Sequence, residues 1–198
     1  RFGGIIAESS RIMEPLIKSF IYHSLEKSGP LSILEIGCGS GEYLRYYADI
    51  NRGNSGTAID IDRSAVAIAE RRIKDNGLEG RFTAFQGNIL ETKDLKGRRF
   101  DLVTSYSNIY YFSGEERNRL YNTVRSLLND NGKFMLATGV KMKNLSSCYY
   151  DLIFSATKGL YPLPEIDELV DELKRSGFSR VETVSLMGRT FMGIVAYM

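Results

Sequence analysis

Short apolar runs alternate with longer amphipathic stretches along most of the chain. Runs of about five residues bounded by glycine or polar residues are typical of buried strands, whereas apolar residues spaced three and four apart are typical of helices. The runs predict strands over residues 32–36, 56–60, 81–86, 99–105 and 133–138. Strands and helices that alternate in this order predict a mostly parallel sheet with helices on both faces.

The amphipathic stretches also carry signals for where helices start and stop. Asp62 is a candidate N-cap, and Gly77 ends the apolar pattern that follows it. Residues 130–132, Asp-Asn-Gly, predict a turn before the fifth strand. The predicted helices run from Ser9 or Ser10 to about Lys27, from the residues after Gly41 to about Ala48, from about Arg63 to Asn76, and from Gly114 to Asn129.

Residues 140–160 break this regular order. We expect them to form a short helix inserted before the next amphipathic helix, residues 165–175. Two closing strands, 179–186 and 190–197, are joined near Gly188 by a connection short enough for a hairpin. The chain therefore predicts an antiparallel pair at the end of the sheet.

Together these elements predict an α/β fold, namely a Rossmann-like, doubly wound, mostly parallel seven-stranded sheet with a C-terminal antiparallel hairpin. A length of 198 residues suits one such core. We divide the chain into an N-terminal helical segment, residues 1–30, as a candidate lid, and a main domain, residues 31–198, with an inserted segment at about 140–162.

The stretch ILEIGCGSG, Ile33 to Gly41, is the most informative motif. A buried strand breaks into three glycines at alternate positions before a helix opens, and a backbone without Cβ atoms can approach a ligand closely. Asp60 follows Gly41 by 19 residues, at the end of the next apolar run. In a βαβ unit its carboxylate would lie beside the glycines, where it can accept hydrogen bonds from the two hydroxyls of a ribose.

The glycine spacing discriminates between two kinds of nucleotide. A dinucleotide loop is spelled GxGxxG and needs its third glycine one position later than Gly41, where this chain has Glu42. The charge of Glu42 would also oppose a pyrophosphate at the start of the helix. The motif therefore favours a nucleoside ligand without phosphate.

This segment resembles motif I, E/D-x-G-x-G-x-G, of the class I S-adenosylmethionine-dependent methyltransferases, in particular their small-molecule members of the methyltransferase domain 11/25 type. The resemblance spans roughly Leu31 to the C-terminus and implies S-adenosylmethionine as cofactor. It implies that Asp60 holds the ribose, that Ile61 packs on the adenine, and that Asn88, where relatives often have Asp, accepts from the adenine amine. The full set of cofactor-binding residues that it implies is Glu35, Gly37, Cys38, Gly39, Gly41, Asp60, Ile61, Asn88, Ile89 and Ser105.

Candidates for the acceptor side follow the fourth strand. A methyl sulfonium is already a strong electrophile, so alignment contributes most and a base helps only when the nucleophile must lose a proton. The segment SYSNIYYF offers Tyr106 and Tyr110 as candidate catalytic residues, with Asn108 and Tyr111 beside them. His23, the only histidine, would be a third candidate if the first helix closed over the site. In the inserted segment, Tyr149, Tyr150 and Phe154 are candidate lid residues.

Charge and cysteine content narrow the choice of partner and setting. The chain has 26 basic and 24 acidic residues, a net charge of +2, which gives no electrostatic argument for a nucleic-acid partner. Its two cysteines, Cys38 and Cys148, lack metal-binding spacing, so we expect no metal site and a reducing, cytoplasmic setting. No apolar run reaches the roughly 18 residues that span a membrane, and we expect no signal peptide in RFGGIIAESS.

The sequence predicts methyl transfer to an O, N or C atom of a small-molecule acceptor, and other classes stay open. A protein or tRNA methyltransferase would dock its large partner on the short basic clusters, and a catalytically inactive module would bind S-adenosylmethionine without turnover. The motif [DNS]PP[YFW], which binds planar amides and flipped adenines, is replaced by residues 107–110, Ser-Asn-Ile-Tyr. Neither cysteine follows a proline, so the Pro-Cys pair of cytosine C5 chemistry is also missing. The oligomeric state stays open, with a homodimer as one candidate.

Overall fold

The computed structural model describes the backbone of residues 2–91, 93–142 and 145–198, and side chains outside residues 2–11 and 145–150. It contains a seven-stranded sheet in the order β3-β2-β1-β4-β5-β7-β6. Every neighbouring pair is parallel except those of β7, which lies antiparallel between β5 and β6. The strands are β1 Ser32–Ile36, β2 Ser55–Asp60, β3 Phe82–Gln86, β4 Phe100–Tyr106, β5 Leu128–Gly139, β6 Arg180–Met187 and β7 Phe191–Tyr197. The predicted fold class is confirmed.

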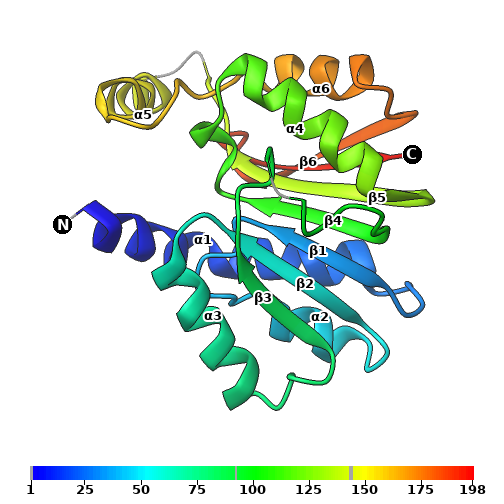
Figure 1. Ribbon diagram of the computed structural model, residues 1–198. Helices are drawn as coiled ribbons and strands as arrows, with labels where there is room; N and C mark the ends of the chain where they lie inside the picture. The colour runs from blue at the N-terminus through cyan, green and yellow to red at the C-terminus, as the bar shows by residue number, and fades with distance from the viewer. Residues whose placement is uncertain (1, 92, 143–144) are drawn as a thin grey trace.

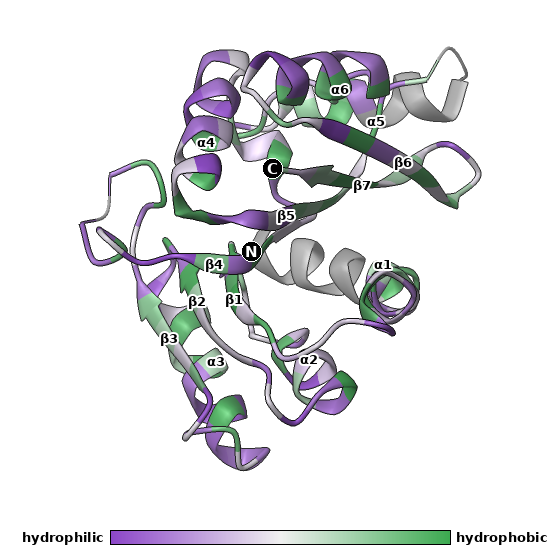
Figure 2. Cartoon of the chain, turned by 90° about the vertical axis from the view of Figure 1, so that its right-hand side faces the viewer, coloured by the Kyte–Doolittle hydropathy of each residue, from purple (hydrophilic) through white to green (hydrophobic). Residues whose placement is uncertain are grey.

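Helices cover both faces of this sheet (Figure 1). Residues of α1, α2 and α3 form one core cluster with the sheet, and residues of α4 and α6 form the other. Figure 2 shows that α4 and α6 turn hydrophilic residues outward. The helices are α1 Phe2–Leu25, α2 Leu44–Ile50, α3 Arg63–Asp75, η1 Ile109–Tyr111, α4 Gly114–Leu127, α5 Leu145–Ala156 and α6 Ile166–Arg175.

The strand order reverses between β1 and β4, which lie side by side at the centre of the sheet. In open parallel sheets, ligands bind at the carboxyl ends of the strands where the order reverses. The N-terminal end of α1 and the inserted helix α5 both lie on that side of the sheet, at the left of Figure 1. We call this side the ligand edge.

Two of the helices begin at caps that the sequence encodes. The side chain of Asp62 accepts from the backbone N–H of Ser64 at 2.8 Å, so the predicted cap of α3 is confirmed. At α4, Ser113 and Glu116 form a reciprocal capping box. These caps fix where α3 and α4 leave the ligand edge.

Two boundaries differ most from the sequence prediction, the start of α1 and the start of β5. Helix α1 begins at Phe2, before the predicted caps Ser9 and Ser10, because a serine caps a helix only where the preceding backbone leaves the helical conformation. Residues 130–132 do not separate a helix from a strand. They lie within β5, where the register to β4 shifts between Phe100 and Leu102, so the Asp-Asn-Gly sequence forms an irregularity inside the strand.

The second half of α1 belongs to the core. Ile17, Phe20, Ile21 and Leu25 are buried in the same cluster as α2. Only the first half of α1 could therefore act as a lid, and that role stays a prediction. Among the residues that the structure describes, no helix is long and apolar enough to cross a membrane.

The interface between α4 and α6 contains a buried ion pair. The guanidinium of Arg117 donates from Nε and Nη2 to the two carboxylate oxygens of Glu172, at 3.0 and 2.7 Å. The same group also pairs with Glu168, whose side chain is 47% exposed, whereas that of Glu172 is 5% exposed. Breaking a buried pair leaves an uncompensated charge, which an exposed pair does not.

Glu172→Gln is therefore expected to lower the free energy of unfolding by about 3–5 kcal/mol. The matched change Glu168→Gln, on the same helix and facing the same arginine, should lower it by less than about 1 kcal/mol. Urea denaturation followed by circular dichroism measures both values. Similar losses in the two variants would contradict the assignment of Glu172 as the buried partner.

Candidate functional site

The three glycines that follow β1 adopt left-handed backbone conformations. Gly37, Gly39 and Gly41 have φ angles of +66°, +50° and +70°, which side-chain-bearing residues rarely adopt. The loop is tied to β2 because the N–H of Gly37 donates to the carbonyl of Ile59 at 2.8 Å. The glycine loop therefore holds a fixed path across the ligand edge.

The three positions differ in what surrounds them. A Cβ on Gly37 would come within 2.1 Å of Nδ2 of Asn108, and one on Gly41 within 2.9 Å of the Cβ of Ala69. A Cβ on Gly39 would meet nothing within 4 Å. Gly37 and Gly41 thus allow close packing inside the protein, whereas Gly39 turns an open side outward, where a ligand can approach the backbone.

Asp60 lies against this open position, as the sequence predicted. Its Oδ2 accepts from the N–H of Gly39 at 2.8 Å, and its Oδ1 accepts from the N–H of Asp62 at 2.9 Å. A carboxylate oxygen can accept more than one hydrogen bond, so both oxygens keep capacity for ligand hydroxyls. Ile61, which follows, is 69% exposed and provides an apolar surface next to the carboxylate.

The segment after β3 completes this side of the site. The N–H of Gly87 donates to the carbonyl of Asp60 at 2.9 Å, which brings the ends of β2 and β3 together. Ile89 is buried in the core, and Asn88 is partly buried with its Oδ1 accepting from the N–H of Leu90 at 3.0 Å. The amide oxygen of Asn88 can accept a second hydrogen bond, so its predicted role stays a prediction.

Glu35 is the least satisfied polar group of the site. Its side chain follows Ile33 on the same face of β1, toward α2, and the residue is 2% exposed. Among the described residues, no group forms a hydrogen bond with its Oε2. Burial, with a further contribution from the charge of Asp60, raises the pKa of Glu35 to about 8.

Tyrosines surround Glu35, and Tyr106 is one of them. Its ring packs edge-to-face on Tyr43 at 5.2 Å, and its hydroxyl is hydrogen-bonded to that of Tyr47 at 3.2 Å. Burial raises the pKa of Tyr106 well above its usual range, so the phenol is neutral near pH 7. This geometry places Tyr106 in the core beside Glu35 and gives no support to its predicted role as a catalytic base.

Ser105 and Asn108 connect β4 to the glycine loop. The hydroxyl of Ser105 donates to Oδ1 of Asn108, whose Nδ2 donates to the carbonyl of Ile36 at 2.7 Å. Ser107 between them has a φ of +54°, which turns Asn108 inward. Both side chains are buried and bonded within the protein, so they support the loop that Gly37 begins.

The aromatic segment after β4 reaches the inserted helix. Tyr110 packs edge-to-face on Phe154 of α5 at 4.7 Å and lies 5.0 Å from the ring of Tyr111. Tyr111 is 41% exposed, and burial together with the charge of Asp60 raises the pKa of its phenol. These rings connect the segment after β4 with α5. The side chains of Tyr149 and Tyr150 lie outside the described residues.

His23 does not belong to the site. It is exposed near the C-terminal end of α1, one residue before Ser24, whose carbonyl accepts from Nζ of Lys133 at 2.9 Å. Lys133 pairs with Leu102 near the start of β4. Since α1 runs antiparallel to the strands, this end lies opposite the ligand edge, and the prediction of His23 as a catalytic base is corrected.

An ion-pair network stabilises the glycine loop. The sequence analysis did not predict it. Glu42 pairs with Arg45 of α2 at 2.8 Å and with Arg72 of α3 at 2.6 Å, and Arg72 also donates to the carbonyl of Ser40. Arg45 lies 3.8 Å from Glu14 of α1. The charge of Glu42 is thus neutralised by partners from two helices, which charge spacing alone would not identify.

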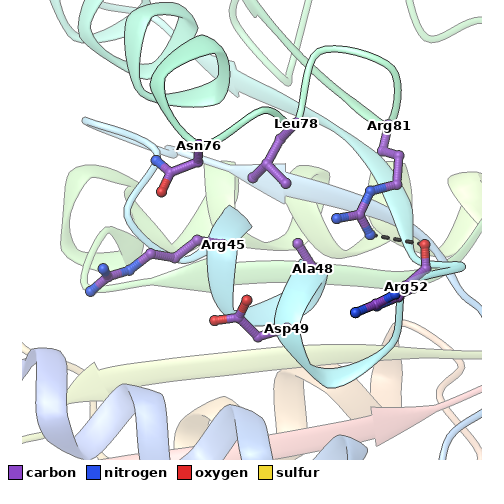
Figure 3. Close-up of a pocket in the computed structure, with 7 residues that line it drawn as sticks. All are labelled: Arg45, Ala48, Asp49, Arg52, Asn76, Leu78 and Arg81. Carbon is purple, nitrogen blue, oxygen red and sulfur yellow. Dashed lines mark hydrogen bonds between the residues drawn. The ribbon is translucent and has the colours of Figure 1, made fainter.

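Two cavities lie away from the glycines. One, of about 700 Å³, is a groove on the outer side of α2, and Figure 3 shows Arg81 bonded there to the carbonyl of Arg52. The other, of about 510 Å³, is lined by Gly114, Lys141 and the segment 161–165. None of the predicted site residues lines either cavity. The first is lined by Arg45, Ala48, Asp49, Arg52, Asn76, Leu78 and Arg81.

Comparison with protein families and relatives agrees with this architecture. A family model described as "Methyltransferase domain" matches residues 33–132, half of the chain. The chain is 31% identical over 121 residues to the release factor glutamine methyltransferase of Bacillus subtilis, covering 58% of this chain and 41% of that protein. It is 24% identical over 168 residues to a phosphoethanolamine N-methyltransferase of Plasmodium falciparum, covering 84% and 60%.

A solved structure shares the whole architecture. An O-methyltransferase family protein from Burkholderia thailandensis superposes with a TM-score of 0.85 at 17% identity, over 98% of this chain and 58% of that one. At this identity the likeness shows the fold alone. The chain spans less than two thirds of the length of each of these three relatives.

The surroundings of Gly37 and Gly39 predict that alanine lowers the free energy of unfolding by different amounts at the two positions. Gly37→Ala should lower the free energy of unfolding by about 2–5 kcal/mol, since left-handed strain adds to overpacking against Asn108. Gly39→Ala should lower it by only about 1–2 kcal/mol, from left-handed strain alone. Urea denaturation of both variants measures the difference. Equal losses of unfolding free energy in the two variants would show that the side chain of Asn108 does not pack against Gly37.

Proposed function

Because the chain belongs to the methyltransferase domain family, we propose that it transfers a methyl group from S-adenosylmethionine to an O, N or C atom of a small-molecule acceptor. One observation carries the proposal: two acidic side chains, Asp60 and Glu35, flank a glycine loop whose middle position is open. A ligand with ribose hydroxyls at one end and an ammonium group at the other satisfies both.

The residues fit this cofactor from end to end. Asp60 would accept from the ribose hydroxyls, and Gly39 leaves room for the ligand beside it. Ile61 and Ile89 would contact the faces of the adenine, with Asn88 accepting from its amine. The unpartnered Oε2 of Glu35 would receive the ammonium group, which removes the penalty of an unsatisfied buried acceptor.

The chemistry itself requires little from side chains. When bound, the cofactor supplies a sulfonium methyl group, which the acceptor's lone pair attacks as the carbon–sulfur bond breaks and its electron pair stays on sulfur. The protein's part is to align the acceptor with that methyl group, and alignment of this kind is worth roughly 7–11 kcal/mol. The fixed glycine loop and the buried ends of β1 and β4 supply rigidity for it.

The aromatic segment after β4 supports an acceptor position next to α5. Tyr110, Tyr111 and Phe154 form an aromatic wall between Asp60 and the inserted helix. Burial raises the pKa values of Tyr110 and Tyr111, so neither phenol is a base near pH 7. This favours acceptors whose nucleophile already has a free lone pair or ionises readily.

Two features favour a small acceptor over a protein amide or a flipped base. Residues 107–110 stand where the amide-gripping motif would lie, and among them the side chain of Asn108 is bonded inward to Ile36 and Ser105. The relative matched over 84% of this chain is a methyltransferase of phosphoethanolamine, a small molecule. The likeness to the release factor methyltransferase spans a shorter part, 58%.

Calorimetric titration with S-adenosylhomocysteine and with NADH tests the cofactor. We expect binding of the first and none of the second, because Glu42 with its two arginines stands where a dinucleotide loop has glycine. Binding of NADH alone would contradict the proposal.

Asp60→Asn is expected to weaken S-adenosylhomocysteine binding by about tenfold to a hundredfold, since hydrogen bonds to a charged group contribute about 1.5–3 kcal/mol. The matched control is Asp62→Asn, two residues away, which keeps a good helix N-cap and should leave the dissociation constant within about twofold. An Asp60→Asn variant that binds as tightly as the parent protein would exclude Asp60 as the ribose ligand.

A further inference from the structure

The groove on the outer side of α2 lies between that helix and the residues that follow α3 (Figure 3). Its volume of about 700 Å³ falls within the roughly 300–1,000 Å³ that is usual for small-molecule sites. Ala48 and Leu78, both buried, line its middle, and polar side chains stand at its two ends. None of residues 37–41, which the structure describes in full, lines this α2 groove, so it is separate from the glycine loop.

One end of the α2 groove carries two arginines without an acidic partner. Nη1 of Arg81 donates to the carbonyls of Arg52 and Asn54, at 2.9 and 3.4 Å, which fixes the Arg81 guanidinium at this end. Arg52 lies beside it and is exposed. Among the described residues, no carboxylate pairs with either arginine, and Nε and Nη2 of Arg81 form no hydrogen bond. This end therefore offers positive charge and guanidinium donors to an anion.

The opposite end of the α2 groove carries hydrogen-bond acceptors. Nδ2 of Asn76 donates to the carbonyl of Arg72 at 2.7 Å, and the Oδ1 of Asn76 faces the groove (Figure 3). The carboxylate of Asp49 turns toward the same end. Arg45, the cation at this end, pairs with Glu42 at 2.8 Å. The groove thus has positive charge at one end and acceptors at the other.

We propose that the α2 groove is a second ligand site, which takes a phosphate monoester of a small molecule that bears hydroxyl groups. The phosphate lies against Arg52 and Arg81, because planar guanidinium groups bind phosphate oxygens in pairs. The hydroxyl groups donate to Oδ1 of Asn76 and to the carboxylate of Asp49, which are both acceptors.

The arrangement of charge favours this class of ligand over other anions. Two guanidinium groups suit the three free oxygens and two charges of a phosphate monoester better than the two oxygens of a carboxylate. A polymer of phosphates is disfavoured, because it would bring further negative charge against Asp49. The site does not depend on the proposed function, and no covalent bond of the ligand changes.

Calorimetric titration with glucose 6-phosphate in a phosphate-free buffer tests the site, with inorganic phosphate and glucose as the two parts of that ligand. We expect glucose 6-phosphate to bind at a single site, inorganic phosphate to bind more weakly, and glucose not to bind. Arg52→Gln should weaken glucose 6-phosphate binding about tenfold to a hundredfold, since a charge-assisted contact is lost. Its side chain forms no hydrogen bond or ion pair among the described residues, so the fold should be unaffected.

The matched control is Arg175→Gln, which neutralises an exposed arginine of α6, on the other face of the sheet. It should leave the dissociation constant of glucose 6-phosphate within about twofold, because distant sites act independently. Equal effects of the two substitutions would overturn the proposal. So would equal affinities for glucose 6-phosphate and inorganic phosphate, because the acceptor end would then contribute nothing.

Two further titrations show whether the site is separate and whether it is made for a small molecule. Saturating S-adenosylhomocysteine should leave glucose 6-phosphate binding unchanged, and competition between them would place the sugar phosphate at the glycine loop instead. Binding of a single-stranded RNA oligonucleotide without binding of glucose 6-phosphate would overturn the proposal in favour of a nucleic-acid surface. A protein that binds glucose 6-phosphate but not S-adenosylhomocysteine would support the α2 groove and contradict the proposed function.

Discussion

The contact between Asn108 and Gly37 is the constraint on which the ligand edge depends. The amide of Asn108 occupies the space that any side chain at position 37 would need, and it bonds to the last carbonyl of β1. This joins the two central strands at the point where the strand order reverses. The path of the glycine loop, and with it the position of Asp60 beside Gly39, follows from that contact.

The same region contains a group that lowers the stability of the free protein. A carboxyl group buried without a hydrogen-bond partner lowers the stability of the free protein, and isosteric apolar residues would pack there more favourably. Glu35 occupies that position between Leu34 and Ile36, both in the core. A buried carboxyl group of this kind is typical of functional sites, where local rules of stability are broken.

Much of the fold and half of the site could be predicted from the sequence. Strand and helix periodicity located the sheet, and the glycine spacing with Asp60 located that carboxylate beside the glycine loop. Side-chain direction after β4 could not be predicted, because it depends on the left-handed Ser107, which turns Asn108 inward, and on the packing of Tyr106 against α2. Nor could the sequence show that the C-terminal end of α1, where His23 lies, is opposite the ligand edge, because helical periodicity does not give the direction in which a helix crosses a sheet.

Strand β7 has a consequence for biosynthesis. It is the last strand in sequence, yet it lies inside the sheet and pairs with both β5 and β6. Until residues 191–197 leave the ribosome, β5 has no neighbour on that side, and its backbone edge is open to pairing with other chains. The nascent protein therefore cannot build this part of the sheet strand by strand, because β5 stays unpaired on that side until β7 is available.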